Sequence, residues 1–309
     1  MVNLSFIMSI QVNNITKMYG TQKALNNVSF DIAPGEIVGF LGPNGAGKST
    51  MMKILTCYIP QTSGEARVCG LNVAEDSISV RRFIGYLPEH NPLYLDMYVK
   101  EYLKFVAGIH KLASKTILVN NIIEKVGLGV EQNKLIGSLS KGYRQRVGLA
   151  QAMIHDPEVL ILDEPTTGLD PNQIVEIRNL IQEIGKEKTV MMSTHIMQEV
   201  EAICNRVIII NKGEIAANDD VKLIKANELN QVVKVEFSAI VHENDLSGIS
   251  GVEKVRNLQG NVWMISANGK NDLRSVIFKF AVEKGIEVLS LQKEEQTIEQ
   301  IFKDLTSAK

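Results

Sequence analysis

No part of the sequence approaches the roughly 20 consecutive apolar residues that a membrane-spanning helix requires. The longest aliphatic runs, Val159–Leu162 and Val207–Ile210, are only as long as a strand. We therefore expect that this 309-residue chain cannot form a transmembrane path by itself.

The sequence also lacks an excess of charge of either sign. Its 33 Lys and Arg residues nearly balance its 35 Asp and Glu residues, which leaves a formal net charge of −2. A dedicated nucleic-acid-binding protein usually carries a basic face. The charge balance therefore disfavours that class, and we expect no nucleic-acid partner.

Cysteine is scarce, and its spacing shows no metal-binding or disulfide pattern. The three cysteines, Cys57, Cys69 and Cys204, form no Cys-x-x-Cys pair. An odd and sparse set of this kind predicts reduced thiols, mostly in the core, in a reducing compartment.

What the sequence does contain is an alternation of short strand-like runs and amphipathic helical segments between residues 8 and 218. Buried strands are predicted at residues 36–41, 84–87, 159–162, 189–193 and 207–210. Their nearly continuous apolarity is typical of a parallel sheet that is covered on both faces. The predicted fold class of this part of the chain is therefore α/β.

A helical segment interrupts this alternation at about residues 90–140. Its apolar residues recur at helical spacing in two stripes, namely Val99, Tyr102, Leu103 and Val106, and then Leu118, Ile122, Ile123 and Val126. We interpret the segment as a helical subdomain inserted into the α/β core.

Two further boundaries are predicted at the ends of the α/β domain. Residues 219–231 are polar and are interpreted as a linker. Residues 232–309 follow the order βαββαβα, with a last helix starting at Thr297, and are interpreted as a small α+β, ferredoxin-like accessory domain. Residues 1–7 precede Met8 without the basic region of a signal peptide and are interpreted as an N-terminal extension outside the fold.

A glycine-rich run follows the predicted 36–41 strand and fits the P-loop pattern G-x-x-x-x-G-K-[ST]. Glycines let the backbone curl so that N–H groups point at phosphate oxygens, and the next helix presents its positive end to the same anion. Lys48 is predicted to reach the β- and γ-phosphates, Ser49 to bind Mg²⁺ and Thr50 to assist near the α-phosphate. The predicted nucleotide-binding residues of this run are Gly42, Pro43, Asn44, Gly45, Ala46, Gly47, Lys48, Ser49 and Thr50.

A second half of the site is predicted where the 159–162 strand ends in Asp163 and Glu164. The strand would deliver Asp163 to the Mg²⁺ shell and place Glu164 to orient or deprotonate the attacking water. Many strands end in acidic turns, so the pair becomes specific only in combination with the P-loop. Phosphoryl transfer depends mainly on positioning and charge neutralisation, which these residue types supply.

Several further motifs stand in a characteristic order around these two. The run Leu139-Ser140-Lys141-Gly142-Tyr143-Arg144-Gln145-Arg146 precedes the 159–162 strand by one helix, and Gly168-Leu169-Asp170 follows it. With these motifs, residues 8–218 closely resemble ATP-binding cassette (ABC) ATPases. Residues 139–146 resemble the signature motif, residues 168–170 the D-loop, His195 the switch histidine, and Tyr19 the aromatic residue that stacks on adenine.

The resemblance implies an ATP sandwich between two copies of the chain. Lys48 and Glu164 of one copy would face Ser140 and Gly142 of the other across one ATP. Ser140 can cap the helix that follows, which creates a site for the γ-phosphate. The resemblance implies catalytic roles for Lys48, Glu164 and His195, with ATP and Mg²⁺ as cofactors.

The sequence departs from the family pattern at two places. Glu89 follows Tyr86-Leu87-Pro88, where the family usually has glutamine. A carboxylate can still ligate Mg²⁺ or hold a water, so the predicted metal ligands are Ser49, Glu89 and Asp163. Lys141 and Tyr143 replace the usual signature residues, and we expect them to alter partner contacts more than chemistry.

For the biological role, the resemblance implies the ATP-hydrolysing subunit of an exporter, bound peripherally at the cytoplasmic face of the membrane. Residues 88–103 and the helical subdomain would dock a separate membrane permease. Within the family, the stretch Phe40–Leu55 and the tail Ile301–Thr306 are most similar to the gliding-motility-associated type.

Two alternatives belong to other classes. A soluble cassette ATPase acting on DNA or ribosomes typically carries two cassettes, zinc-binding cysteines or long coiled coils, none of which the sequence shows. A P-loop kinase would not explain residues 139–146 or His195.

Overall fold

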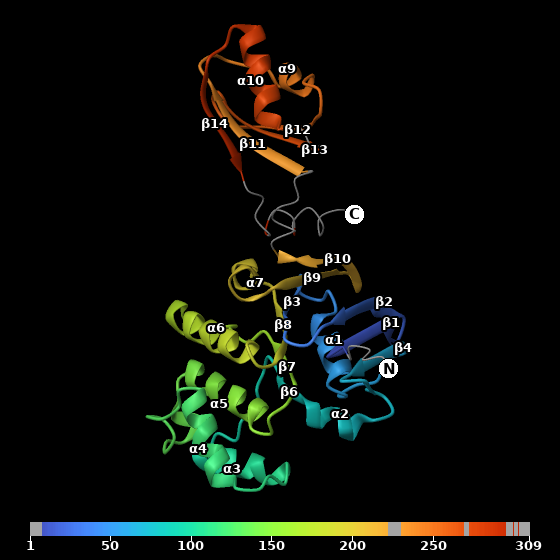
Figure 1. Ribbon diagram of the computed structural model, residues 1–309, viewed down its shortest axis with the longest axis vertical. Coiled ribbons are helices and arrows are strands. Elements are labelled where there is room, and N and C mark those ends of the chain that lie inside the picture. The colour runs from blue at the N-terminus through green and yellow to red at the C-terminus, as the bar shows by residue number, and fades with distance from the viewer. Residues whose placement is uncertain (1–7, 222–229, 269–271, 295–298, 300–301, 303–309) are drawn as a thin grey trace, which may run out of the picture. The chain divides into compact units, whose positions relative to one another are not determined.

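The computed structural model describes residues 8–221, 230–268, 272–294, 299 and 302 (Figure 1). The chain divides into two compact units, Met1–Val221 and Lys222–Ala308. The predicted N-terminal extension, residues 1–7, and the predicted helix start at Thr297 lie outside the described residues. No helix in the described ranges is both long and apolar enough to cross a bilayer.

A six-stranded sheet forms the centre of the first unit, and all five predicted strands belong to it. Five neighbouring strands of this sheet run parallel to one another, and a sixth strand pairs antiparallel at one edge. From the parallel edge the order is β6 (Ile84–Leu87), β7 (Val159–Asp163), β8 (Thr189–Thr194), β3 (Ile37–Leu41), β9 (Arg206–Asn211) and β10 (Glu214–Asp220). The predicted α/β fold class is therefore confirmed.

The linker predicted to begin at residue 219 overlaps the last of these strands. Asp219 and Asp220 pair with Val207 and Arg206 in the antiparallel edge of the sheet. The far end of that linker overlaps β11, which begins at Asn230. Polar composition misplaced the first end because β10 is an edge strand, which exposes its side chains and tolerates charged residues. At the second end the polar residue Gln231 is buried in β11, a strand that is paired on both sides.

A second, antiparallel sheet was not predicted from the sequence. Its order is β2 (Gln22–Ile32), β1 (Ile10–Tyr19), β4 (Ser63–Val68) and β5 (Leu71–Asn72). The pairing of β1 with both neighbours is shifted in register after Val12 and Asn13, so the apolar residues of β1 do not alternate regularly. This irregularity hides the strand from a period-two pattern.

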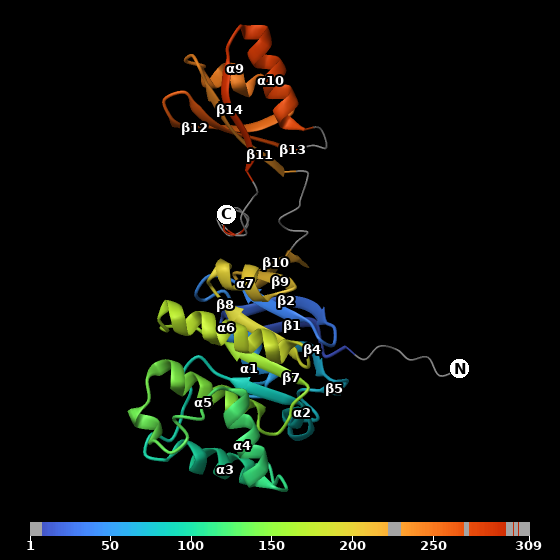
Figure 2. The same ribbon diagram turned by 60° about the vertical axis from the view of Figure 1, so that its left-hand side comes forward.

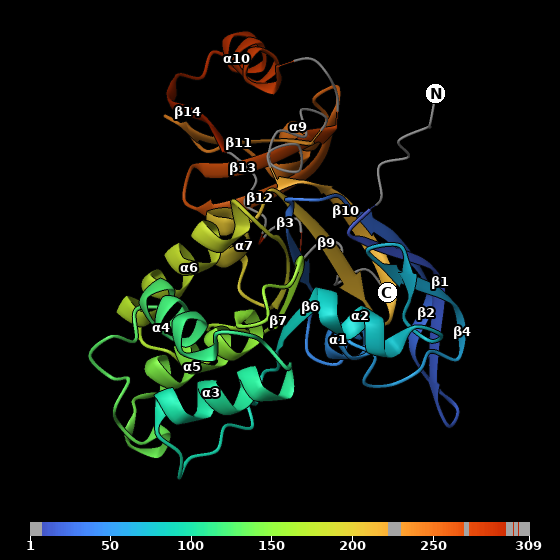
Figure 3. The ribbon, with the colours of Figure 1, turned by 60° about the horizontal axis from the view of Figure 1, so that its bottom comes forward.

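Helix α1 (Lys48–Leu55) packs against strands of both sheets (Figure 3). Met51, Met52, Ile54 and Leu55 are fully buried there, in one core with Phe40 of β3 and residues of β1, β2 and β4. On the other face of the parallel sheet, a Cβ at Gly39 would lie 3.0 Å from Val200 of α7 (Met197–Ile203). The parallel sheet is therefore covered on both faces, as its apolar strands predict.

The inserted helical subdomain is seen in Figure 2 as α3 (Val99–Ile109), α4 (Lys115–Lys125) and α5 (Lys141–Met153), which lie together at the lower end of the first unit. It also contains a short 3₁₀ turn (Ile136–Ser138). The predicted α3 residues Val99, Tyr102, Leu103 and Val106 are all buried. The remaining helices of the first unit are α2 (Ser77–Phe83) and α6 (Pro171–Gly185).

The second unit has the element order that the sequence predicts within its described part. The elements are β11 (Asn230–Phe237), α9 (Glu243–Ser247), β12 (Val252–Gln259), β13 (Val262–Asn268), α10 (Leu273–Lys284) and β14 (Val288–Glu294). The strands form an antiparallel sheet in the order β12-β13-β11-β14. A βαββαβ chain with this strand order has the ferredoxin-like arrangement.

Candidate ATP-binding and hydrolysis site

The P-loop connects the C-terminal end of β3 to the N-terminus of α1 and requires glycine at two positions. Gly47, the residue before α1, has φ of 110°, and a Cβ there would lie 2.6 Å from the carbonyl oxygen of Ala24. A Cβ at Gly42 would lie 2.5 Å from the carbonyl oxygen of Ile210. The glycine pattern therefore reflects both a left-handed backbone and close packing.

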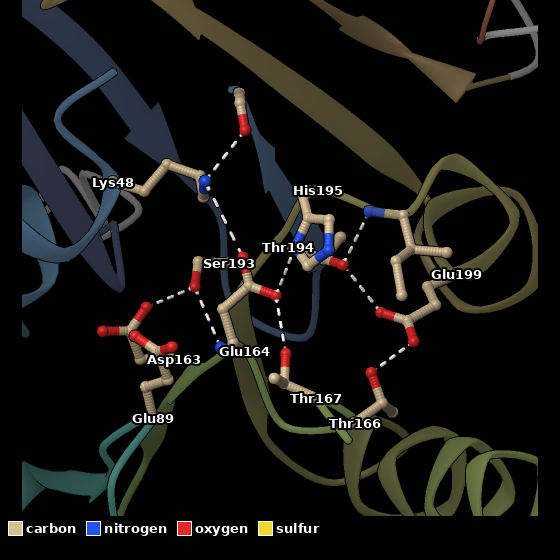
Figure 4. Close-up of polar contacts among 12 residues, drawn as sticks. Lys48, Glu89, Asp163, Glu164, Thr166, Thr167, Ser193, Thr194, His195 and Glu199 are labelled. Carbon is tan, nitrogen blue, oxygen red and sulfur yellow. Dashed lines mark hydrogen bonds and ion pairs between the residues drawn. The ribbon is translucent and has the colours of Figure 1, made fainter. Parts of the chain in front are cut away.

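Lys48 is the first residue of α1 and directs its ammonium group back over the loop (Figure 4). Its Nζ donates hydrogen bonds to the carbonyl oxygens of Gly42 at 2.8 Å and Pro43 at 3.3 Å. The same Nζ lies 3.7 Å from Oε1 of Glu164, and both side chains are less than a tenth exposed. A buried cation held in this way is suited to binding the phosphates of a nucleotide.

Asp163 ends β7 and meets residues from two other segments. The hydroxyl of Ser49 donates to its Oδ1 at 3.3 Å, and the hydroxyl of Ser193 on β8 donates to the same oxygen. Glu89 lines one cavity together with Ser49 and Asp163, and Figure 4 shows both carboxylates on the same side of Glu164. The structure therefore brings together the three predicted metal ligands, Ser49, Glu89 and Asp163.

Glu164 sits in a strained turn directly after β7. Its φ is 51°, and its backbone N–H donates to the Ser193 hydroxyl at 3.0 Å. The side chain is only 8% exposed, and its Oε2 accepts hydrogen bonds from Thr167 Oγ1 at 3.1 Å and from His195 Nδ1 at 2.9 Å. Unfavourable backbone geometry that is held by several contacts is typical of functional positions.

These residues surround one cavity of about 460 Å³. It is lined by Gln22, Ala24, Asn44, Gly45, Gly47, Lys48, Ser49, Thr50, Glu89, Glu164, Thr167 and His195. Of the other predicted P-loop residues, Gly42 and Pro43 hold Lys48 and Ala46 is buried. A cavity lined by P-loop backbone, a lysine, a serine hydroxyl and two carboxylates suits a nucleoside triphosphate.

Tyr19 does not line this cavity in the described structure. Its side chain is half exposed at the end of β1, and the Nζ of Lys17 lies 5.3 Å from its ring centroid. Its stacking role on adenine therefore stays a prediction. Gln22 and Ala24 of the neighbouring strand do reach the cavity, and no sequence pattern indicates them.

Sequence reasoning also missed Thr167 and Ser193 as members of the site. Each stands within three residues of a motif residue, Glu164 or His195, and carries a hydroxyl that could have marked it. The Thr167 contact with Glu164 is made within one turn of the chain, whereas the contacts of Ser193 form because β7 and β8 are paired neighbours in the sheet.

A second cavity, of about 430 Å³, adjoins the first through Ser49 and Glu89. It also receives Lys53, Tyr58, Tyr86, Pro88, His90, Pro92, Gln151 and Asp163. Burial raises the pKa of the Tyr86 hydroxyl, and the carboxylates of Asp163 and Glu89 add to this rise. The cavity therefore connects the predicted metal ligands to the surface around residues 88–92.

Ser140 and Gly142 lie at a separate, smaller cavity. Ser140 caps α5 as the sequence predicts, because its hydroxyl accepts from the backbone N–H of Tyr143. Gly142 is buried against Gln173, where a Cβ would lie 2.7 Å from that side chain. Ser140, Gly142 and Tyr143 line this cavity of about 170 Å³, which shares no lining residue with the cavity at Lys48.

The chain is similar in sequence to known proteins. The family model described as ABC transporter matches residues 25–167. The bacitracin transport ATP-binding protein BcrA of Bacillus licheniformis is 35% identical over 301 residues, which cover 95% of each chain.

The chain belongs to the ABC transporter ATP-binding family. The linearmycin resistance ATP-binding protein LnrL of Bacillus subtilis is 31% identical over 96% of this chain and 98% of its own. The lantibiotic transport ATP-binding protein SrtF of Streptococcus pyogenes is 39% identical over 67% of this chain and 88% of its own.

Solved structures of ABC subunits agree with the fold of the first unit. A dimeric ATP-binding cassette in a post-hydrolysis state, bound to ADP and phosphate, superposes with a TM-score of 0.63 at 26% identity and covers 68% of this chain and 98% of its own. The CbiO1 subunit from Clostridium perfringens has a TM-score of 0.66 at 28% identity, over 72% and 92% of the two chains.

As an ABC ATP-binding subunit, the chain binds ATP and hydrolyses it to drive transport, dimerises, and works with a separate membrane permease. The relatives described above are named for transport and resistance, which disfavours the alternative of a soluble ATPase acting on DNA or ribosomes. Their names lend no support to the gliding-motility type.

Proposed function

We propose that this ABC subunit hydrolyses ATP with Glu164 as general base and powers the export of an antibiotic compound. The arrangement that carries the proposal is the convergence of Lys48, Glu164 and His195 on one cavity behind the P-loop. The similarity to BcrA and LnrL spans nearly the whole length of each chain, and both are named for transport of, or resistance to, an antibiotic.

In this proposal Lys48 and the N-terminus of α1 bind the terminal phosphates of ATP. The lysine is already desolvated and held by the loop, so little reorganisation is needed when an anion enters. Glu164 takes the proton of the attacking water at Oε1, because Oε2 is occupied by Thr167 and His195. His195 fixes the orientation of this carboxylate.

The donor set fits Mg²⁺, which the family commonly uses. Ser49 supplies a hydroxyl, and Asp163 and Glu89 supply carboxylate oxygens, which are the hard ligands that Mg²⁺ prefers. The described residues form no cluster of three or more metal-binding His, Cys, Asp or Glu side chains. Such an open set matches Mg²⁺ held by one or two side chains together with nucleotide phosphates, where the ion neutralises phosphate charge.

A second copy completes the site. Ser140 and Gly142 line a cavity of their own, so a single copy does not place them beside Lys48. We infer that these two residues contact the γ-phosphate bound at the P-loop of the other copy. ATP then joins the copies, and its hydrolysis separates them.

The partner permease docks beside the second cavity, at the cytoplasmic face of the membrane. The predicted docking segment, residues 88–103, contributes Pro88, Glu89, His90 and Pro92 to that cavity. Exposed apolar side chains gather in the same region, where Tyr94 packs against Tyr102 and Phe105 while remaining about half exposed itself. An apolar surface of this kind is suited to a protein partner.

The proposal is tested in the cell that produces the chain. Deleting the chain is expected to raise sensitivity to bacitracin or to a lantibiotic, and the natural sequence is expected to restore resistance where Glu164→Gln does not. The chain is also expected to sediment with membranes in complex with an integral membrane protein. Unchanged sensitivity to every antibiotic tried would contradict export of this class, and recovery as a free monomer would contradict the docking.

A further inference from the structure

Glu199 is a carboxylate with no contact to solvent, placed just behind the hydrolysis site. It lies in α7, and its exposed fraction is 0%. It does not line the cavity that contains Lys48, Glu164 and His195. A charged side chain in this position needs compensating contacts, since burial of an unpaired carboxylate is costly.

The compensation comes from two threonine hydroxyls, one in the loop that follows β7 and one at the end of β8 (Figure 4). Thr166 Oγ1 donates to Oε1 of Glu199, and Thr194 Oγ1 donates to Oε2 at 2.7 Å. Thr194 is the donor because a carboxylate oxygen can only accept, and the Thr194 oxygen itself accepts the backbone N–H of Ile196 at 3.0 Å. Both carboxylate oxygens are therefore engaged, one to each loop.

The two threonines lie within two residues of Glu164 and His195 in the chain. Thr166 stands two residues after Glu164, in the loop that follows β7. Thr194 immediately precedes His195, at the end of β8. Glu199 thus bridges the backbone of the proposed general base to the backbone of the histidine that holds it.

Two further groups lie close to the Glu199 carboxylate. Arg178 of α6 places Nη2 4.0 Å from Oε1 of Glu199. Burial raises the pKa of the neighbouring Cys204 thiol, and the Glu199 charge adds to this rise. Thr166, Thr194 and Glu199 are all buried, so water does not compete for these hydrogen bonds.

We propose that Glu199 is a positioning residue for ATP hydrolysis, because it holds the loop of Glu164 and the loop of His195 at the separation that their hydrogen bond requires. The inference rests on the proposed roles of Glu164 and His195. Small misplacements of catalytic groups cost rate rather than substrate binding, since the phosphate contacts of Lys48 are made elsewhere.

The test removes one hydroxyl at a time from the full-length protein. Thr194→Val and Thr166→Val keep the side-chain volume, and each is expected to lower kcat for ATP about tenfold while the ATP Kd changes less than about twofold. Thr194→Ser and Thr166→Ser restore the hydroxyl and are expected to restore kcat. Glu199→Ala removes both contacts, and its melting temperature is measured beside its kcat to separate folding from rate.

A matched control distinguishes the positioning of Glu164 and His195 from the general packing of α6 against α7. Gln182 of α6 donates to the carbonyl oxygen of Ala202 in α7 at 2.7 Å, so it links the same helices without touching either loop. Gln182→Ala is expected to leave kcat at its parental value. An equal loss of kcat in Gln182→Ala and Thr194→Val would overturn the inference.

A double-mutant cycle with His195 gives the second readout. If Thr194 acts through His195, adding Thr194→Val to His195→Ala lowers kcat no further. Independent, multiplicative losses would overturn the inference. Glu164→Gln tests the proposed general base separately. ATP hydrolysis at the parental rate in that variant would contradict the role of Glu164. Loss of hydrolysis in Glu164→Gln, with no loss in the threonine variants, would contradict only the positioning role of Glu199.

Discussion

His195 and Glu164 belong to segments that are 31 residues apart, yet Nδ1 of the histidine lies 2.9 Å from Oε2 of the carboxylate. The glutamate is buried and the histidine is about half exposed, so the pair links the interior of the cassette to the open side of the cavity. One oxygen of the base is therefore engaged, and the other remains available on the side of Lys48, at 3.7 Å from Nζ.

Glu164→Gln is expected to abolish steady-state ATP hydrolysis while ATP binding is retained. The amide keeps the size of the side chain but cannot accept the proton of the attacking water, and loss of a general base costs on the order of 10²–10⁴ in rate. Phosphate release measures the rate, and size-exclusion chromatography with ATP is expected to show an accumulated dimer. Hydrolysis at the parental rate would contradict the assignment.

Lys48→Ala is expected to weaken ATP binding by roughly 10- to 100-fold, because a hydrogen bond to a charged group contributes about 1.5–3 kcal/mol. Titration with a fluorescent ATP analogue measures the Kd. Lys53→Ala is the matched control, since Lys53 lies on the same helix but is exposed and does not line the P-loop cavity. Similar losses in both variants would show that net charge, and not the position of Lys48, determines affinity.

Gly47→Ala is expected to destabilise the chain more than Gly45→Ala does, even without nucleotide. Both glycines have positive φ, which costs an alanine about 1–2 kcal/mol. Only at Gly47 would the new Cβ also meet a backbone carbonyl oxygen, that of Ala24 at 2.6 Å, whereas the space around Gly45 is open. Melting temperatures of the nucleotide-free variants measure the order, and equal values would contradict the packing argument.

His155 is expected to make the cassette sensitive to acid. Its ring stacks on His110 with centroids 4.1 Å apart, and its Nε2 lies 3.0 Å from the carbonyl oxygen of Ile84. Burial, with a smaller effect of His110, lowers the pKa of His155 from 6.5 to about 4. The nearby Asp156 raises the pKa of His155, whereas Lys188 lowers it, as His110 does.

The sign of the effect follows from proton uptake. Between pH 6.5 and about 4 the unfolded chain binds a proton at this histidine that the folded chain does not bind, so stability falls as the pH falls through this window. The contribution is roughly 1–3 kcal/mol. His155→Gln is expected to flatten the dependence of denaturation midpoint on pH in this range, whereas His90→Gln, at a side chain that is 91% exposed, is expected to leave it unchanged.

Much of the first unit could be predicted because the chemistry is local in the chain. The P-loop and α1 are contiguous, so one run of residues determines the anion site. Asp163 and Glu164 could be placed because the C-terminal ends of parallel strands share one edge of the sheet. The cap at Ser140 was likewise predictable, because hydroxyl and N–H belong to the same helix start.

Other features could not be predicted because their periodicity is broken or their partners are distant. The register shifts in β1 hide the antiparallel sheet, although that sheet supplies Gln22 and Ala24 to the cavity. The last two residues of β10, Asp219 and Asp220, were assigned to a linker, because charged residues are accepted at the exposed edge of the sheet.

The sequence by itself determined the family, the α/β fold and the phosphate-binding run, since all three depend on residue types at fixed spacings. Tertiary structure alone decided how Glu164 is held, because Ser193, His195 and the buried Glu199 reach its loop only through the pairing of β7 with β8 and the packing of α7 behind them. Such contacts join residues about 30 positions apart, and no local pattern of apolar and polar residues encodes them.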